Sequence, residues 1–284
     1  MGKFSNVLFS SDFDHTLSGM DGEVPQKNID AIRYFIAEGG RFTLNSGRSI
    51  PLLRPKLGLI PVNAPCLCYN GAACYDYAAE QLFYAHPMPE FAKELVAAAQ
   101  AYDPTLALEV QRIEAHYPIG DALERSAFLR RRGKISMQLD GEIPFPWMKL
   151  VVCAADPDGA FEDPNHIPAE VSARMTAMTQ YLRELAAGKC YIARSMPLIL
   201  EIGPFGWDKG RAARELAEKL GCKTLVCAGD APNDLEMLQC ADISFAPSDC
   251  DPEVRALADV RLTAPCGVGA VAAAIEQLDA LFEA

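Results

Sequence analysis

The sequence predicts a mixed α/β protein built on a parallel, doubly wound sheet, and three observations lead to this fold class. In the first and last thirds of the 284-residue chain, short apolar runs alternate with segments of helical apolar spacing, and this alternation is typical of a parallel sheet. A middle stretch of about 110 residues has a different character, which indicates an inserted second unit. Several apolar runs end in polar loops, where open α/β sheets bind their ligands.

The first strand and its loop are the most informative segment. Residues 7–9 form an apolar run consistent with a buried strand, and Asp12 and Asp14 follow it two positions apart. Two acids this close repel unless a cation or a shared proton intervenes. Mg²⁺ suits that role, because it is usually held by one or two carboxylates together with substrate phosphate. The alternative is a strand end with an Asx-type turn.

The remaining elements of the core follow from apolar spacing and from Gly and Pro stops. The expected elements are, in order, a helix at 29–36, a strand at 41–44, a helical segment from 51, a strand at 64–69, a strand at 198–202, a helix at 209–220, strands at 224–228 and 243–246, and a helix at 269–281. We therefore expect residues 1–85 and 197–284 to form one discontinuous core.

Residues 86–196 are expected to form the inserted α/β unit. Residues 86–89 contain two prolines and have the composition of a hinge. The expected elements after it are a helix at 90–101, strands at 106–113, 134–139 and 148–154, and a helix at 169–187. Polar side chains near the predicted strand ends are candidates for substrate selection, namely Arg112, His116, Arg194 and Ser195.

Composition limits the classes of partner. The chain carries 26 Lys and Arg against 38 Asp and Glu, a net charge of −12, which argues against broad binding to nucleic acid or to an anionic membrane. No stretch approaches the ~18 apolar residues of a membrane span, and the first strand leaves no room for a signal peptide. The ten cysteines include no Cys-x-x-Cys pair, so we expect buried, reduced thiols in a cytoplasmic protein.

Three further loops carry matching chemistry. Ser46 and Gly47 precede a helix and offer a hydroxyl and backbone N–H groups to a phosphate, although such a pair is more often a simple turn. Lys209 begins a helix, where it is either a compact positive charge beside a phosphoryl group or merely solvated. Residues 229–234 place acids and an amide at the end of an apolar strand, and capping explains Asp234 but not Asp230.

Taken together, the four loops resemble the haloacid dehalogenase-like hydrolase superfamily. The match comprises Asp12-x-Asp14-x-Thr16, Ser46, Lys209 and Gly229-Asp230-x-x-Asn233-Asp234, in the family's order. The insertion between the second and third motifs, and the segments 69–72 and 200–210, are similar to the Cof-type (class IIB) branch. The resemblance covers the whole chain and implies a Rossmann-like parallel-sheet core with an inserted α/β cap.

The resemblance also implies a role for each motif residue. Asp12 would be the nucleophile that forms an aspartyl-phosphate, and Asp14 would be the general acid and base. The Mg²⁺ ion would be held by Asp12, the backbone carbonyl of Asp14 and Asp230, with Asp234 acting mainly through water. The phosphoryl oxygens would be bound by Ser46, Gly47, Lys209 and Asn233.

Two positions depart from the family pattern. Position 15 is His where the family most often has Gly, and we expect His15 to pack in the loop rather than to act as a catalytic acid. Residues 246–250 replace an Asn-Ala pair that is common in Cof-type sequences, which leaves the catalytic loops untouched.

The implied function is a Mg²⁺-dependent phosphatase of a small phosphorylated metabolite, such as a sugar phosphate, in a monomer or small homo-oligomer. The alternatives are a phosphomutase on the same fold, similar to phosphomannomutase, and a non-catalytic sugar-phosphate sensor. A mutase would need a bisphosphate and would not accumulate free phosphate. A sensor would not need its motif acids, and all of them are present.

Overall fold

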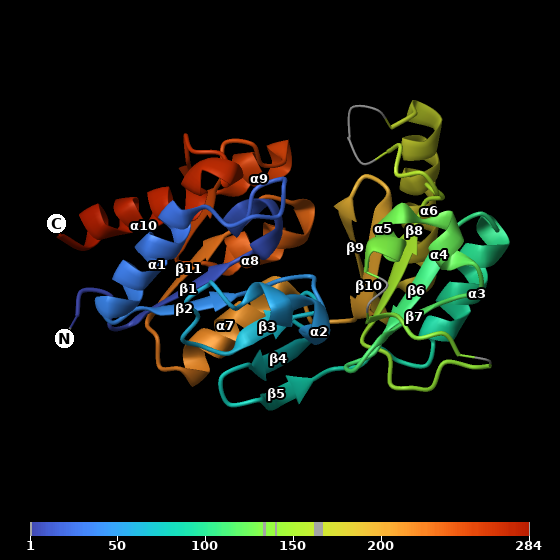
Figure 1. The fold of residues 1–284 in the computed structure, drawn as a ribbon, viewed down its shortest axis with the longest axis horizontal. Coiled ribbons are helices and arrows are strands. Elements are labelled where there is room, and N and C mark those ends of the chain that lie inside the picture. Colours follow the sequence, from blue (N-terminus) through green and yellow to red (C-terminus); the bar gives the residue numbers. More distant parts are fainter. Residues whose placement is uncertain (1, 133–134, 140, 162–166, 284) are drawn as a thin grey trace. The chain divides into compact units, whose positions relative to one another are not determined.

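The chain divides into two compact units. The computed structural model describes residues 2–132, 135–139, 141–161 and 167–283. Unit 1 comprises Met1–Arg48, Leu53–Tyr84 and Asp208–Ala284, and unit 2 comprises Ser49–Leu52 and Ala85–Trp207. Figure 1 labels the elements of both units.

Unit 1 contains a five-stranded sheet in which every pair of neighbours is parallel. Its order is β13-β12-β11-β1-β2, with bounds Val260–Arg261, Ile243–Ala246, Thr224–Ala228, Val7–Ser11 and Arg41–Leu44. The last residue of β1, Ser11, pairs with Ala228 on one side and with Leu44 on the other. The predicted parallel core is confirmed, and the carboxyl ends of β11, β1 and β2 lie in register.

Helices pack on both faces of this sheet, because successive side chains of a buried strand point to opposite faces. On one face, Leu8 and Leu225 pack with Leu216 and Met237, which come from α7 (Lys209–Lys219) and α8 (Leu235–Cys240). On the other, the Phe9 ring lies 5.9 Å from that of Phe35 in α1 (Gln26–Ala37). The remaining helices of unit 1 are α9 (Pro252–Leu257) and α10 (Cys266–Glu283).

The strand predicted at 64–69 forms, but it does not belong to the five-stranded parallel sheet. It is β3 (Cys66–Cys68) in a separate sheet with β4 (Ala73–Asp76) and β5 (Gln81–Ala85). Strand β3 pairs antiparallel with β4, and an isolated parallel bridge between Asn45 and Leu67 links it to the end of β2. The left-handed backbone of Tyr69, Asn70 and Gly71 reverses the chain directly after β3.

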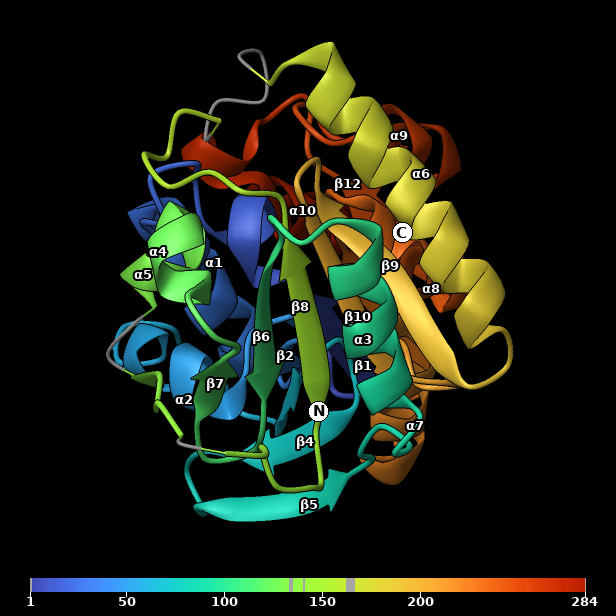
Figure 2. The ribbon, with the colours of Figure 1, turned by 90° about the vertical axis from the view of Figure 1, so that its right-hand side faces the viewer.

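Unit 2 contains a five-stranded antiparallel sheet in the order β7-β6-β8-β10-β9. The strands span His116–Pro118, Ala107–Gln111, Lys149–Cys153, Ile199–Pro204 and Cys190–Met196. The helices of unit 2 are α2 (Ile50–Leu53), α3 (Ala92–Tyr102), α4 (Ala122–Arg125), α5 (Ala127–Arg131) and α6 (Ala169–Ala186). Figure 2 shows α3 and α6 over one face of the sheet, where a large apolar cluster is buried.

Two expectations for the inserted unit need correction. The strand expected at 198–202 forms as β10, but it pairs with β8 and β9 of unit 2. Unit 1 therefore resumes at Asp208 rather than at Pro197, because an apolar run is equally compatible with either sheet. The strand expected at 134–139 does not form over 135–139, where Ser136 makes a single bridge to His116, and residue 134 lies outside the described residues.

No helix in the described ranges is long and apolar enough to span a membrane.

The close approach of α7 and α8 in unit 1 depends on Gly210. A Cβ atom at this position would lie 2.3 Å from the backbone carbonyl oxygen of Glu236, so any side chain must push the two helices apart. We expect Gly210→Ala to lower the free energy of unfolding by about 1–3 kcal/mol, the usual cost of overpacking. Denaturant unfolding followed by circular dichroism measures this difference.

Gly58→Ala is the matched control, because nothing lies within 4 Å of its Cβ position. We expect this variant to unfold within about 0.5 kcal/mol of the parent chain. Equal stability of the two variants would show that the helices tolerate separation at Gly210.

Candidate active site

Asp12 lies at the carboxyl end of β1, which is flanked by β11 and β2 in the parallel sheet. Its backbone N–H donates to the carbonyl oxygen of Ala228 at 2.9 Å, which continues the β1–β11 ladder by one bond. Its side chain is buried, with 5% of the residue exposed. The loop that follows β11 therefore begins directly beside Asp12.

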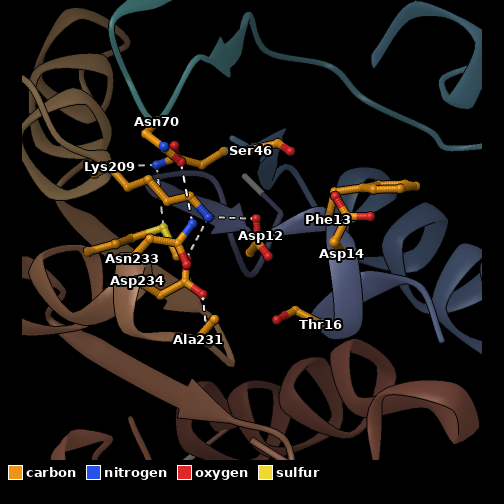
Figure 3. Close-up of polar contacts among 12 residues, drawn as sticks. Asp12, Phe13, Asp14, Thr16, Ser46, Asn70, Lys209, Ala231, Asn233 and Asp234 are labelled. Atoms are coloured by element: carbon orange, nitrogen blue, oxygen red, sulfur yellow. Dashed lines mark hydrogen bonds and ion pairs between the residues drawn. The ribbon is translucent and has the colours of Figure 1, made fainter. Parts of the chain in front are cut away.

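Lys209 joins this loop to Asp12. It is the first residue of α7, whose N-cap is Asp208, the side chain of which accepts from the N–H of Arg211 at 2.8 Å. The Lys209 ammonium donates to Asp12 Oδ1 and to Asp234 Oδ1, both at 2.6 Å, and Figure 3 shows it between the two carboxylates. Burial alone lowers the pKa of Lys209, but the two carboxylates outweigh it and raise the pKa, so the ammonium stays charged.

Asp234 is fixed by the backbone of its own loop. Its Oδ2 accepts from the N–H groups of Asp230 at 3.0 Å and Ala231 at 3.1 Å. A Cβ at Gly229 would lie 2.5 Å from the Cβ of Asp234, so the loop closes this tightly only with Gly there. Asp234 is the N-cap residue of α8 but makes no side-chain cap bond to that helix, so the expected capping role is wrong. It instead bonds back to Ala231, the N-cap of the short 3-10 helix Pro232–Asp234, and its other oxygen accepts from Lys209.

Asp230 completes a cluster of three carboxylates. Its Oδ1 accepts from the Thr16 hydroxyl at 2.6 Å, and oxygen atoms of Asp12, Asp230 and Asp234 lie within 4.8 Å of one another. Burial is the largest cause of a raised pKa at Asp12, to about 7, and at Asp230. One ammonium does not balance three carboxylates, of which Asp12 and Asp234 are buried and Asp230 is partly buried, so the donors and the charge of this cluster fit a hard divalent cation.

Asp14 lies apart from this cluster. Arg48 binds its carboxylate through two hydrogen bonds, Nε to Oδ2 at 2.8 Å and Nη2 to Oδ1 at 2.7 Å. The Arg48 guanidinium also lies over the Phe13 ring, 4.9 Å from its centroid. In Figure 3, Asp14 points to the side of Asp12 opposite Lys209. A contribution of the Asp14 backbone carbonyl to a metal site stays a prediction.

Ser46 and Asn233 are two of the residues expected to bind a phosphoryl group together with Lys209. Ser46 is buried, and its hydroxyl oxygen accepts from the N–H of Arg48 at 3.1 Å. Its own backbone N–H donates to Leu67 at 2.9 Å, so this N–H is already engaged. Asn233 donates to the side-chain oxygen of Asn70 at 3.3 Å. The hydroxyl of Ser46 and the amide of Asn233 are therefore the groups available for an anion, with Lys209 between Asp12 and Asp234.

Arg48 and Asn45 were missed by the sequence analysis. Asn45 is fully buried, and its amide donates to the backbone carbonyl oxygen of Lys209 at 2.8 Å. This contact ties the end of β2 to the start of α7. The only signal in the sequence was that both residues flank Ser46 and Gly47.

The four selection candidates all lie in unit 2, and three of them have polar partners there. His116 is fully buried beside Glu109, and Arg112 pairs with Glu114 at 3.0 Å. Arg194 donates to Thr176 Oγ1 at 2.9 Å and to the carbonyl of Pro197. Ser195 is partly exposed.

Comparison with known proteins finds similarity over most of the chain. A family model described as haloacid dehalogenase-like hydrolase matches residues 9–140 and 162–275. The chain is 27% identical over 259 residues to YxeH of Bacillus subtilis (strain 168), covering 87% of this chain and 89% of that protein. It is 22% identical over 253 residues to HMP-PP phosphatase of Escherichia coli O8 (strain IAI1), covering 88% and 86%.

Solved structures share the fold. A haloacid dehalogenase-like hydrolase from Bacteroides thetaiotaomicron matches with a TM-score of 0.75 at 21% identity, over 95% of this chain and 98% of that one. The HAD subclass IIB sugar phosphatase BT4131 matches with a TM-score of 0.73 at 17% identity, over 96% and 98%. Both likenesses extend through unit 1 and unit 2.

His15 adopts a left-handed backbone, with φ of 58°. Histidine tolerates this region better than most residues, whereas a β-branched residue there is strained. We expect His15→Gly to unfold within about 1 kcal/mol of the parent chain and His15→Val to be destabilised by about 1–3 kcal/mol. Thermal unfolding of the two variants measures the order, and equal stability would mean that φ does not restrict this position.

Proposed function

Because the chain belongs to the haloacid dehalogenase-like hydrolase family, in its Cof-type branch, we propose that it is a Mg²⁺-dependent phosphatase of a small phosphorylated metabolite. The observation that carries the proposal is the buried contact of Lys209 with Asp12 beside Asp230 and Asp234. The relatives named HMP-PP phosphatase and sugar phosphatase support this class of substrate, and a sugar phosphate is our choice within it.

Asp12 is the proposed nucleophile. One of its oxygens attacks phosphorus, the bond to the leaving-group oxygen breaks, and an aspartyl-phosphate forms. Lys209 favours the ionised form of Asp12 that this step needs, because its ammonium lies 2.6 Å from Asp12 Oδ1 and opposes the effect of burial on the pKa. A water molecule then attacks the phosphorus, which releases phosphate and restores the carboxylate.

Asp14 is the proposed general acid and base. It gives a proton to the leaving oxygen in the first step and takes one from the attacking water in the second. Its side chain is about half exposed, and Arg48 holds it by two bonds on the side away from Lys209. Arg48 would thus fix the orientation of Asp14 between turnovers.

Three groups would stabilise the phosphoryl charge. The Lys209 ammonium, the Ser46 hydroxyl and the Asn233 amide are donors of fixed position, since each is buried and held by neighbours. Donors placed in advance stabilise a developing charge without reorganising during the reaction.

Asp12 and Asp230 would hold Mg²⁺ directly, together with the Asp14 backbone carbonyl, and Asp234 would act through water. The bound ion would supply positive charge to the phosphoryl oxygens. We further propose that unit 2 serves as the cap that selects the leaving group, since it is joined to unit 1 by short connections and has its own core.

Asp12→Asn should abolish phosphate release while the fold is retained, because the amide keeps the shape and lacks the nucleophilic charge. A colorimetric phosphate assay over a panel of phosphorylated metabolites measures this, with Asp30→Asn on the exposed face of α1 as the control. Phosphate release near the parent rate would exclude covalent catalysis at Asp12. Absence of phosphate release, together with conversion of the substrate that requires an added bisphosphate, would favour the mutase alternative.

Activity should require Mg²⁺ and should fall at least about tenfold when Ca²⁺ replaces it. Calcium takes more ligands at longer distances, so it would misplace Asp12 relative to phosphorus. The measurement is phosphate release in chelator, then after addition of each ion. Full activity in excess chelator would refute the metal assignment.

A further inference from the structure

Asn45 is a polar residue that unit 1 buries completely, directly after β2. The sheet fixes its main chain, since its N–H donates to the carbonyl oxygen of Ser11 at 2.8 Å and the residue forms a parallel bridge with Leu67. A buried side-chain amide costs free energy unless hydrogen bonds compensate it. The contacts of this amide therefore account for an asparagine at this position.

The amide nitrogen of Asn45 lies within hydrogen-bond distance of three acceptors in unit 1. The carbonyl oxygen of Lys209 lies at 2.8 Å, Met237 Sδ at 3.3 Å and Ser10 Oγ at 3.4 Å. Among the described residues, nothing donates to Asn45 Oδ1. The reversed amide would place this oxygen against the Lys209 carbonyl oxygen, and both atoms are acceptors. The amide therefore has one orientation, with its nitrogen toward Lys209.

Lys209 is held at both of its ends. Its carbonyl oxygen accepts from Asn45, and its ammonium donates to Asp12 and Asp234 at 2.6 Å each (Figure 3). A lysine stem is flexible in water, but that of Lys209 is buried, and close packing limits its rearrangement. A shift of the Lys209 main chain is therefore passed on to the ammonium.

Other contacts fix the start of α7 relative to its own loop and to α8. The side chain of Asp208 accepts from the N–H of Arg211 at 2.8 Å, and Cys240 Sγ donates to the carbonyl oxygen of Gly210 at 3.2 Å. Neither contact involves β1 or β2. The Asn45 amide supplies a bond from the sheet to the same turn of the helix.

The two hydrogen bonds of Asn45 connect Lys209 to the residue before Asp12. One runs from the Asn45 backbone N–H to the Ser11 carbonyl oxygen, and the other from the Asn45 amide to the Lys209 carbonyl oxygen. Ser11 ends β1, and Asp12 follows it. The separation of the two main chains that carry the ammonium and the carboxylate thus depends on one asparagine.

We propose that Asn45 is a positioning residue, which holds the main chain of Lys209 where its ammonium reaches both Asp12 and Asp234. This inference rests on the proposed function, in which Lys209 and Asp12 act on the same phosphoryl group. A displacement of about 1 Å within such a group of reacting side chains can cost on the order of 100-fold in rate.

The first experiment is Asn45→Leu, because leucine has nearly the same shape as asparagine and lacks the donor. With the metabolite that the parent chain turns over fastest, we expect kcat to fall about 10- to 100-fold. We expect KM to change by less than about threefold, since the loss falls mainly on the transition state. An unchanged kcat, or a loss confined to KM, would overturn the proposal.

Asn63→Leu is the matched control at the opposite end of β2. The Asn63 side chain donates to the carbonyl oxygen of Gly40 at 2.9 Å and accepts from the N–H of Phe42 at 2.7 Å. It should lower the melting temperature and keep the parent kcat when both variants are assayed below their melting temperatures. Equal losses of kcat in the two variants would refute a specific role of Asn45. If Asn45→Leu does not fold, Asn45→Ala removes the same donor and replaces it in both assays.

A spectroscopic measurement separates this inference from the proposed function. Hydrogens of a buried, hydrogen-bonded ammonium exchange slowly with water, so the Lys209 Nζ signal is measured by ¹H–¹⁵N NMR and assigned by its loss in Lys209→Arg. In Asn45→Leu we expect exchange to be at least about tenfold faster, and in Asn63→Leu to be unchanged. Faster exchange in a chain that releases no phosphate supports the positioning role and refutes the phosphatase alone. Unchanged exchange in a chain that releases phosphate refutes the positioning role alone.

Discussion

The contact of the Lys209 ammonium with the buried carboxylates of Asp12 and Asp234 constrains the geometry of unit 1. Lys209 lies 2.6 Å from both Asp12 and Asp234, and Asp230 adds a third carboxylate to the same cluster. Removing one charge from such a group leaves the others buried and unpaired, which is strongly destabilising. The parallel sheet, the start of α7 and the loop after β11 are therefore held in one geometry by the same charges.

The cluster of Asp12, Asp230 and Asp234 carries more negative charge than the Lys209 ammonium balances. Burial outweighs the effect of Lys209 and raises the pKa of Asp12 to about 7, so the site favours a further positive charge, such as a divalent cation, that restores the ionised form. Asp14 is kept outside the cluster by Arg48. Two carboxylates two positions apart thus have different surroundings, which is the condition for a nucleophile and an acid–base group to coexist.

The sheet of unit 2 differs from that of unit 1 in the side chains that its two faces bury. Its apolar face is covered by α3 and α6 and supplies the core, while its other face buries Glu109, Gln111 and His116. Buried polar groups are kept only where hydrogen bonds or function compensate their cost. The two units therefore bury different groups: unit 1 gathers carboxylates at the end of its parallel sheet, and unit 2 buries a carboxylate, an amide and an imidazole.

The sequence by itself determined the parallel core and the motif acids, because apolar periodicity and the spacing of Asp12, Asp14, Asp230 and Asp234 are local properties. It could not decide the partners of those residues. Whether residues 199–204 join one sheet or the other depends on pairing with strands distant in the chain. Likewise, tertiary packing brings Arg48 into hydrogen-bond distance of Asp14. It also buries Glu109 among the described residues with no donor to its Oε2.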